Sequence, residues 1–232
     1  MEYKNIIKAE FVSRPNRFIA HCLVKGEPVT AHVKNTGRCR ELLVPGATVY
    51  LEHSSNPKRK TQYSLIAVEK GSRLINMDSQ APNSIAAQGI EQGVIRLPLE
   101  PGESIRQIKR EVTYGESRFD LQVLTTRRAF FVEVKGVTLE EGGAALFPDA
   151  PTQRGVKHMH HLIQAMEEGY SCCILFIIQM ESIAYFSPNY KTHREFGEAL
   201  AQAQEKGVAV LAYDCHVAPG RVEAKGPVEV CL

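Results

Sequence analysis

Three ionisable residues in two neighbouring segments have the types and the spacing of a metal-dependent hydrolytic site. Asp120 lies in the segment 117–124, and Glu133 and Lys135 lie in the segment 129–135. Both segments are rich in β-branched and aromatic residues and are joined by a short polar run, a pattern that indicates a β-hairpin. The chemistry of the three side chains therefore depends on how the two strands pair.

The register of this hairpin follows from the position of its turn. Counting outward from the midpoint between Thr126 and Arg127 places Asp120 directly opposite Glu133. Directly opposed residues of an antiparallel pair have β-carbons about 5 Å apart on one face of the sheet. Lys135 is expected on the same face as Glu133, because side chains alternate along a strand.

Two carboxylates at this separation repel each other, and one would take up a proton unless a cation lies between them. Mg²⁺ or Mn²⁺ fits the description, because a hard divalent ion is commonly held by one or two carboxylates together with water and substrate phosphate. Lys135 would orient or deprotonate the attacking water, or stabilise the phosphate. The pattern thus indicates metal-assisted phosphodiester hydrolysis. The alternative is an exposed, salt-bridged stripe of Asp120, Glu133 and Lys135 on a half-solvated sheet.

The composition is that of a soluble globular protein. The chain has 232 residues, of which 44% are hydrophobic and 23% are charged. It contains neither a stretch of about 18 apolar residues, as a membrane span requires, nor the layout of a signal peptide at residues 1–5. The six cysteines lack metal-binding or disulfide spacing and read as reduced, packed thiols. We therefore expect a cytoplasmic protein without a membrane partner.

Charge is unevenly distributed along the chain. Residues 1–80 contain 13 Lys and Arg against 7 Asp and Glu, a balance of +6, whereas residues 81–232 contain 15 against 19, a balance of −4. A basic first part next to an acidic second part favours contact of the first part with a polyanion. A chance excess of solvated lysines is the alternative.

The first 80 residues read as short strands separated by turns. The expected strands are 18–24, 29–33, 47–52 and 63–69. Several short strands at near-regular spacing indicate a small β-barrel, and a five-stranded oligonucleotide-binding (OB) barrel is the natural candidate. We expect a first domain at residues 1–80 that binds nucleic acid.

Residues 81–232 alternate helical and strand-like patterns. Helices are expected at 83–92, 152–168 and 193–206, and strands at 104–114, 118–124, 129–137, 172–179, 183–186, 208–213 and 228–232. A loop is expected after Val137. This order calls for a mixed sheet with helices packed on it, so the fold class is mixed α/β (α+β).

The helix expected at 152–168 has two faces. Met159, Leu162 and neighbouring apolar residues lie on one, and Arg154, Lys157, His158 and His161 cluster on the other. The second face is a basic stripe suited to a phosphate backbone, or an ordinary solvated face. A zinc site at the two histidines is disfavoured, because no cysteine or carboxylate is arranged beside them.

Three separated motifs, in order along nearly the whole chain, resemble those of the sugar fermentation stimulation protein A family. They are Asn35-Thr36-Gly37-Arg38 with Glu41-Leu42, Ser117-Arg118-Phe119-Asp120 with Val132–Leu139, and Phe147–His158. The resemblance implies an N-terminal OB-like barrel and a C-terminal domain similar to PD-(D/E)xK nucleases. It also implies DNA binding without strong sequence preference and a regulatory role in maltose metabolism.

The resemblance also assigns roles to residues. Asp120, Glu133 and Lys135 match the catalytic positions of the nuclease fold, with Asp120 and Glu133 as metal ligands. A glutamate on the preceding helix often completes such a site, and Glu91 is the candidate. The residues expected to contact DNA are Lys34, Asn35, Arg38, Arg154, Lys157 and His158.

Three functions remain open at this point. The first is a Mg²⁺- or Mn²⁺-dependent DNA nuclease. The second is a non-catalytic DNA-binding regulator of sugar metabolism on a nuclease-like scaffold, because a shared fold does not establish activity. The third is a protein whose basic part contacts a protein partner. Whether the chain forms a homodimer is also open.

Overall fold

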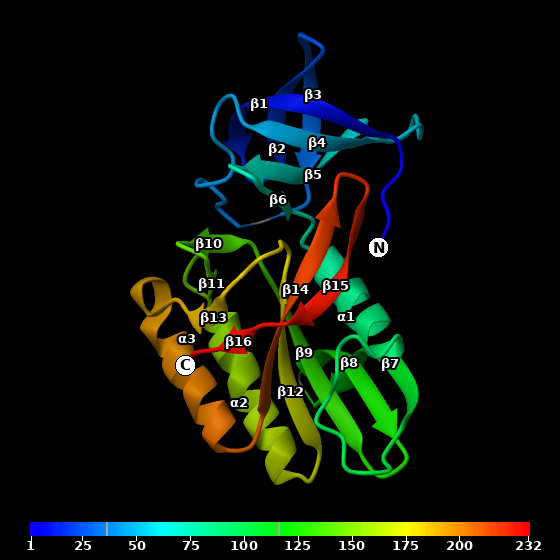
Figure 1. The fold of residues 1–232 in the computed structure, drawn as a ribbon, viewed down its shortest axis with the longest axis vertical. Coiled ribbons are helices and arrows are strands. Elements are labelled where there is room, and N and C mark those ends of the chain that lie inside the picture. Colours follow the sequence, from blue (N-terminus) through cyan, green and yellow to red (C-terminus); the bar gives the residue numbers. More distant parts are fainter. Residues whose placement is uncertain (36, 116) are drawn as a thin grey trace.

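The structure, a computed structural model, describes residues 1–35, 37–115 and 117–232. A β-barrel forms one end of the molecule, and a larger unit of sheets and helices forms the other (Figure 1). The last barrel strand ends at Asn76 and the first helix begins at Ala81, so only a short segment joins the two parts. This arrangement agrees with the expected mixed α/β fold with an N-terminal OB-like barrel.

The barrel is built from five strands and extended by a sixth. The strand order is β3-β2-β1-β4-β5-β6, and a parallel pairing between β3 and β5 closes the barrel. The strands are β1 (Ile6–Asn16), β2 (Ile19–Val24), β3 (Glu27–Val33), β4 (Thr48–His53), β5 (Tyr63–Lys70) and β6 (Arg73–Asn76). Four of them match the expected segments, whereas β1 and β6 were missed by the sequence analysis.

The second part is centred on a six-stranded mixed sheet of order β15-β14-β12-β9-β8-β7. The strands are β7 (Ile105–Tyr114), β8 (Ser117–Thr125), β9 (Ala129–Val137), β12 (Ser171–Ile178), β14 (Ala209–Ala218) and β15 (Arg221–Pro227). Strands β9, β12 and β14 run parallel at the centre, and antiparallel strands flank them. Residues 172–178 are fully buried, as the continuous apolar run predicted for a strand covered on both faces.

A second, smaller sheet lies beside the first, with order β10-β11-β13-β16. Its strands are β10 (Leu139–Glu141), β11 (Ala144–Phe147), β13 (Tyr185–Pro188) and β16 (Glu229–Val230). The prediction of a loop after Val137 is therefore wrong, because β10 and β11 form a hairpin there. The turn is made by Gly142 and Gly143 at φ of 59° and 90°, a conformation that glycine adopts without steric cost.

The second part contains three helices: α1 (Ala81–Glu91), α2 (Gln153–Glu167) and α3 (Tyr190–Glu205). Helices α1 and α2 cover the central sheet, and α3 packs on α2 and on β13. Helix α2 begins at the expected place, because the Thr152 hydroxyl accepts a hydrogen bond from the Gly155 amide and caps the helix. Met159 and Leu162 on its apolar face are fully buried. In the described part of the chain, every helix is too short or too polar to cross a bilayer.

Helices α1 and α2 pack on opposite faces of the central sheet. Ile174 and Phe176 of β12 belong to the same core cluster as the apolar residues of α2. Cys173 and Leu175 belong to a second cluster, with the apolar residues of α1. Strand β9 is sandwiched in the same way, so polar side chains on it must lie in a largely enclosed environment.

Candidate metal and phosphate site

The candidate site lies on the side of the central sheet that faces the barrel. It is formed by residues from β9, the first turn of α1 and the first turns of α2, which are joined by side-chain contacts. Both helices lie below the barrel in Figure 1. Gly136 of β9 packs so closely against α1 that a β-carbon there would stand 2.6 Å from Pro82 Cγ. Strand and helix are thus in direct contact at the site.

The register of β8 and β9 is the one expected from the sequence. Leu121 pairs with Val132 and the ladder continues in step to Leu124 and Ala129. The ladder ends before Asp120, so Asp120 is not paired with Glu133 across the strands. Asp120 instead contacts Asn83 of α1, whereas Glu133 contacts His158 of α2. The Asp120 carboxylate takes the place of a backbone acceptor from β8, because its Oδ2 accepts a hydrogen bond of 2.8 Å from the Val134 amide of β9.

Asp120 has a second partner that the sequence analysis did not identify. Asn83 Nδ2, in the first turn of α1, donates a hydrogen bond of 2.7 Å to Asp120 Oδ1. Burial and the negative charge of Glu133 raise the pKa of Asp120 above its usual value, against the opposing effect of the Val134 amide and Lys135. Folding therefore places this carboxylate where its ionised form is disfavoured.

Glu133 is the most enclosed member of the site, with only 2% of its surface exposed. Lys135 Nζ donates to Glu133 Oε1 at 2.5 Å, and His158 Nδ1 makes a close contact with the same oxygen. Burial opposes ionisation, but these contacts outweigh it and lower the pKa of Glu133. The alternative of an exposed, salt-bridged stripe is thus wrong about the exposure of Glu133, whereas the salt bridge between Glu133 and Lys135 is present.

The second oxygen of Glu133 has a different environment. Oε2 is buried, and within the described residues no hydrogen-bond donor reaches it. A buried carboxylate oxygen without a partner is costly, and in native proteins such an atom usually has a specific reason. It is the clearest sign of an additional ligand at this site.

His158 has a different place from the one expected. It was expected to contact DNA from the basic stripe of α2, but its ring turns inward between Glu133 and Lys135, with Nδ1 3.4 Å from Lys135 Nζ. Arg154 Nε lies 3.3 Å from its other ring nitrogen. The i to i+4 spacing on α2 carries this chain of contacts from the exposed Arg154 to the site.

The other residues of the basic stripe on α2 are of two kinds, exposed and half-buried. Arg154 and Lys157 are exposed on the helix surface. His161 is half-buried, and its Nδ1 makes a close contact with the Ser117 hydroxyl of β8. Only Arg154 and Lys157 keep the solvent-facing position expected for contact with phosphate.

Glu91 does not join the site, which corrects the expectation from the nuclease resemblance. It is exposed at the last residue of α1, whereas the helix reaches Asp120 through Asn83 in its first turn. Eight residues of helix separate Asn83 from Glu91, or about 12 Å along the axis. The helix was expected to supply a carboxylate, but it supplies an amide.

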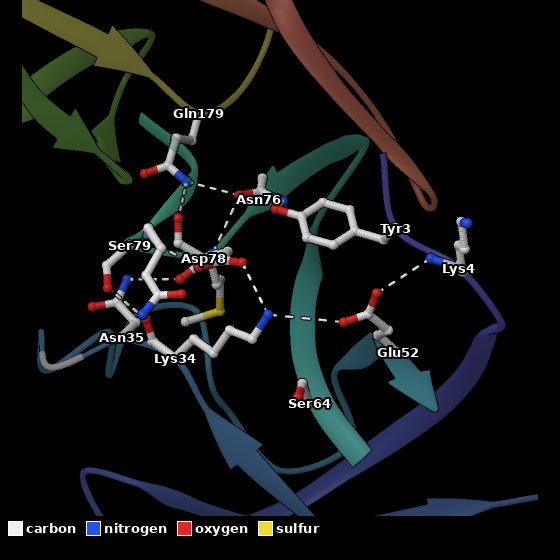
Figure 2. A network of polar contacts seen from close by, with 12 residues as sticks. Tyr3, Lys4, Lys34, Asn35, Glu52, Ser64, Asn76, Asp78, Ser79 and Gln179 are labelled. Carbon is white, nitrogen blue, oxygen red and sulfur yellow. Dashed lines mark hydrogen bonds and ion pairs between the residues drawn. The ribbon is translucent and has the colours of Figure 1, made fainter. Parts of the chain in front are cut away.

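Lys34 and Asn35, expected to bind DNA, are engaged in the junction between the barrel and the second part (Figure 2). Lys34 Nζ lies 3.3 Å from Asp78 Oδ2 and 3.8 Å from Glu52 Oε2, and its side chain is only 21% exposed. Asn35 Nδ2 donates to the Met77 carbonyl and Asn35 Oδ1 accepts from the Gly37 amide. Both side chains contribute to the junction, and their contact with DNA stays a prediction.

The same network reaches the central sheet. Gln179, just after β12, donates from Nε2 to Asn76 Oδ1 at 2.8 Å and to the Asp78 carbonyl at 3.0 Å (Figure 2). Asn76 in turn donates to the Tyr3 hydroxyl at 3.1 Å. Hydrogen bonds of buried groups thus fix the barrel against the part that carries the site.

Arg38 keeps its exposed position. Its backbone amide donates to Asp149 Oδ2 at 3.2 Å, and its side chain faces solvent. The contact joins the Asn-Thr-Gly-Arg motif to the Phe147–His158 motif, which lie far apart in sequence. Thr36, the second residue of the first motif, lies outside the described residues.

Comparison with known proteins agrees with this architecture along the whole chain. Residues 12–77 match the SfsA N-terminal OB domain, and residues 80–221 match the sugar fermentation stimulation protein RE domain. Two relatives, each a sugar fermentation stimulation protein homolog, come from Desulfitobacterium hafniense (strain Y51) and Ruminiclostridium cellulolyticum. They are 53% and 51% identical over 232 residues, which cover 100% of this chain and 99% and 100% of theirs.

A solved structure is similar over the same extent. The structure of Pyrococcus furiosus SfsA in complex with Ca²⁺ superimposes with a TM-score of 0.88 at 30% identity, covering 100% of this chain and 98% of that one. The order of the two matched domains, the sequence identities and the coverage all indicate the same family. The chain belongs to the sugar fermentation stimulation protein family.

Proposed function

We propose that this protein is a divalent-metal-dependent nuclease that hydrolyses phosphodiester bonds of DNA. The observation that carries the proposal is the buried Oε2 of Glu133, which lacks a hydrogen-bond donor among the described residues. The negative charge of Glu133 also raises the pKa of Asp120, so the two carboxylates interact. A cation would satisfy this oxygen and relieve the repulsion between the two carboxylates. Asp120 and Glu133 are the residues that would hold it.

The donor set fits a hard ion such as Mg²⁺ or Mn²⁺. No group of three or more His, Cys, Asp and Glu able to hold a metal is found among the described residues. Mg²⁺ does not require one, since it is commonly bound by one or two carboxylates with water and substrate phosphate. The Pyrococcus furiosus relative was solved with Ca²⁺, another ion that takes oxygen ligands.

When bound, such an ion supplies Lewis-acid chemistry, polarising a phosphoryl oxygen and acidifying a water. Lys135 places an ammonium group 2.5 Å from Glu133 Oε1, where it orients or deprotonates the attacking water or stabilises charge on the phosphate. Asn83 holds Asp120 in position through Oδ1. Arg154 and Lys157, exposed on α2, are placed to hold the phosphate backbone.

The test is cleavage of plasmid and of single-stranded DNA with Mg²⁺ or Mn²⁺. Lys135→Met should lower the cleavage rate at least a hundredfold, because it removes a charge that acts on the reacting groups (about 10²- to 10⁴-fold for a positioned acid or base). It should leave metal binding, followed by the metal-dependent rise in Tm, in place. Asp120→Asn should abolish both.

The matched control is Lys206→Met, at an exposed position at the end of α3 remote from the site. It should cleave at the wild-type rate. Cleavage that persists undiminished in both Lys135→Met and Asp120→Asn would come from a contaminant and would refute the proposal.

The second candidate is a non-catalytic DNA-binding regulator of sugar (maltose) metabolism. It is favoured by the contacts of Glu133 Oε1, which is paired with Lys135 and contacted by His158, as in a structural ion-pair cluster. This alternative requires salt-dependent DNA binding without cleavage, and a Tm that does not respond to Mg²⁺ or Mn²⁺.

A further inference from the structure

A groove of about 510 Å³ lies at the end of the barrel where β1 turns into β2. The end of β1 with the following turn forms one wall, and the connector between β3 and β4 forms the other. Phe11, Val12, Leu43 and Pro45 contribute apolar surface to the lining. The turn between the first two strands is one of the loops with which OB barrels bind oligonucleotides.

Arg14 fixes the shape of this groove. Its Nη1 donates to the carbonyls of Gly37 and Arg38, and its Nη2 donates to the carbonyls of Arg17 and Asn35, at 2.7 to 2.9 Å. One side chain therefore ties the two walls together. A groove with its walls held in place loses little conformational entropy when a ligand binds.

The remaining arginines of the lining are available to a ligand. Arg17, Arg38 and Arg40 are exposed, and none of them takes part in the ion pairs found among the described residues. The carboxylate of Asp149 is close but accepts from the backbone amide of Arg38. Three unpaired guanidinium groups around one groove favour an anionic ligand.

The groove is also bordered by exposed apolar side chains. Seven large hydrophobic side chains are exposed among the described residues. One of them, Val12 at 40%, lines the groove, and two more, Phe18 at 45% and Val44 at 48%, are next in sequence to lining residues. The guanidinium of Arg17 lies over the Phe18 ring, 4.8 Å from its centroid. An exposed aromatic ring beside exposed arginines is a platform on which an unpaired base can stack.

The groove lies near the candidate site. Gly37 lines both this groove and a smaller cleft of about 180 Å³ that also includes Asp149 and Gly136. Gly136 directly follows Lys135 in β9. Gly37 is packed against Asp149, because a β-carbon added there would stand 2.5 Å from Asp149 Oδ2. The groove and the cleft therefore lie on either side of this contact.

We propose that the groove binds a single strand of DNA, with a base on Phe18 and phosphates on Arg17, Arg38 and Arg40. This inference deepens the proposed nuclease function and rests on it for the fate of the bound strand. The choice of a single strand follows from the mixed lining. Bases of a duplex already stack on each other, whereas unpaired bases can use Phe18 and the apolar floor.

The test is fluorescence anisotropy in EDTA, where metal-dependent cleavage is blocked, with labelled oligothymidylate of roughly 12 nucleotides and a hairpin duplex. Phe18→Ala should weaken binding of the single strand about tenfold, the loss expected for one stacked base, and change duplex binding little. Phe18→Tyr should retain wild-type affinity because it keeps the ring. Arg38→Glu and Arg40→Glu should each weaken binding and reduce its dependence on salt.

Lys206→Glu is the control for charge reversal and should bind as the wild type does. Equal affinity of wild type and Phe18→Ala for the single strand, or an equal loss in Lys206→Glu, would overturn the inference. The two proposals fail separately. If single-strand binding depends on Phe18 but no cleavage occurs in Mg²⁺, only the proposed nuclease activity is refuted. If Phe18→Ala cleaves the single strand at the wild-type rate, only the proposed binding in the groove is refuted.

Discussion

At the scale of single residues, Asp120 is placed where it costs stability unless a cation is present. Burial and Glu133 raise its pKa, so the folded protein binds a proton at Asp120 more tightly than the unfolded chain does. Stability from this group is therefore lost as pH rises through the raised pKa. At neutral pH, Asp120 is a destabilising residue in the metal-free protein.

Asp120→Asn is thus expected to raise the Tm in EDTA by about 3 °C, the size expected for about 1 kcal/mol in a chain of this length. The asparagine oxygen can still accept from the Val134 amide. The same variant should lose the rise in Tm that Mn²⁺ gives the wild type. Calorimetry at two pH values gives the check, because the difference in EDTA should disappear in acid. A variant less stable than wild type in EDTA would contradict this account.

Single residues also show how far the sequence could predict the site. The register of β8 and β9 from Leu121 to Ala129 follows from the centre of one turn, which is a local property. The expected pairing of Asp120 with Glu133 lies beyond this ladder. Asn83 and His158 come from helices whose approach to the sheet is set by tertiary packing. The spacing of Arg154 and His158 indicated a shared helix face, but no local pattern showed that this face turns toward β9.

At the scale of elements, the contact between β9 and α1 positions Asn83 against Asp120. Gly136→Ala would place a β-carbon 2.6 Å from Pro82 Cγ and 2.7 Å from Gln179 Oε1. A proline ring on a helix cannot yield cheaply, so we expect a loss of about 1–3 kcal/mol in unfolding free energy and lower metal affinity. The measurements are urea unfolding and calorimetric titration with Mn²⁺.

The control is Gly226→Ala. Gly226 also lies in a strand, and its nearest heavy atom to an added β-carbon is 3.9 Å away. It should leave both stability and metal affinity near the wild-type values. Equal effects of the two substitutions would show that Gly136 has no special role at the site.

The elements also show which parts of the fold could be predicted from local sequence patterns and which could not. Strand β12 and helix α2 were predictable because a continuous apolar run and a capped amphipathic pattern are complete within each segment. Strand β1 was missed, because register shifts after Phe11 and Ser13 interrupt its alternation and Pro15 lies near its end. The hairpin of β10 and β11 was missed because its strands are only three and four residues long.

At the scale of the whole molecule, a buried charge helps fix the barrel to the second part. Glu140 of β10 is held by Lys70 Nζ at 2.7 Å and by Arg73 Nη1 at 2.8 Å, both from the barrel. Burial opposes its ionisation, but the hydrogen bonds from Lys70 and the Gly143 amide outweigh this and lower the pKa of Glu140. Its stabilisation is therefore present above the ordinary glutamate pKa of 4.5 and lost as pH falls through the lowered value.

Glu140→Gln is expected to lower the unfolding free energy at neutral pH by about 1–2 kcal/mol, since charged hydrogen bonds become neutral ones. The deficit should shrink as the pH falls below 4.5. Urea unfolding across this range gives the measurement. Glu198→Gln, which breaks an exposed pair with Arg194, is the control and should change stability by less than about 0.5 kcal/mol. A deficit in Glu140→Gln that grows in acid would contradict the sign.

The central claim concerns the whole molecule as well, because the junction, the sheet and two helices meet at one carboxylate pair. The most direct measurement is the anomalous difference map of a crystal of the wild-type protein soaked in Mn²⁺. The account expects a peak bonded to both Asp120 and Glu133 Oε2, at about 2.0–2.6 Å as for hard divalent ions. A map with Mn²⁺ bound elsewhere and none between these two carboxylates would contradict it.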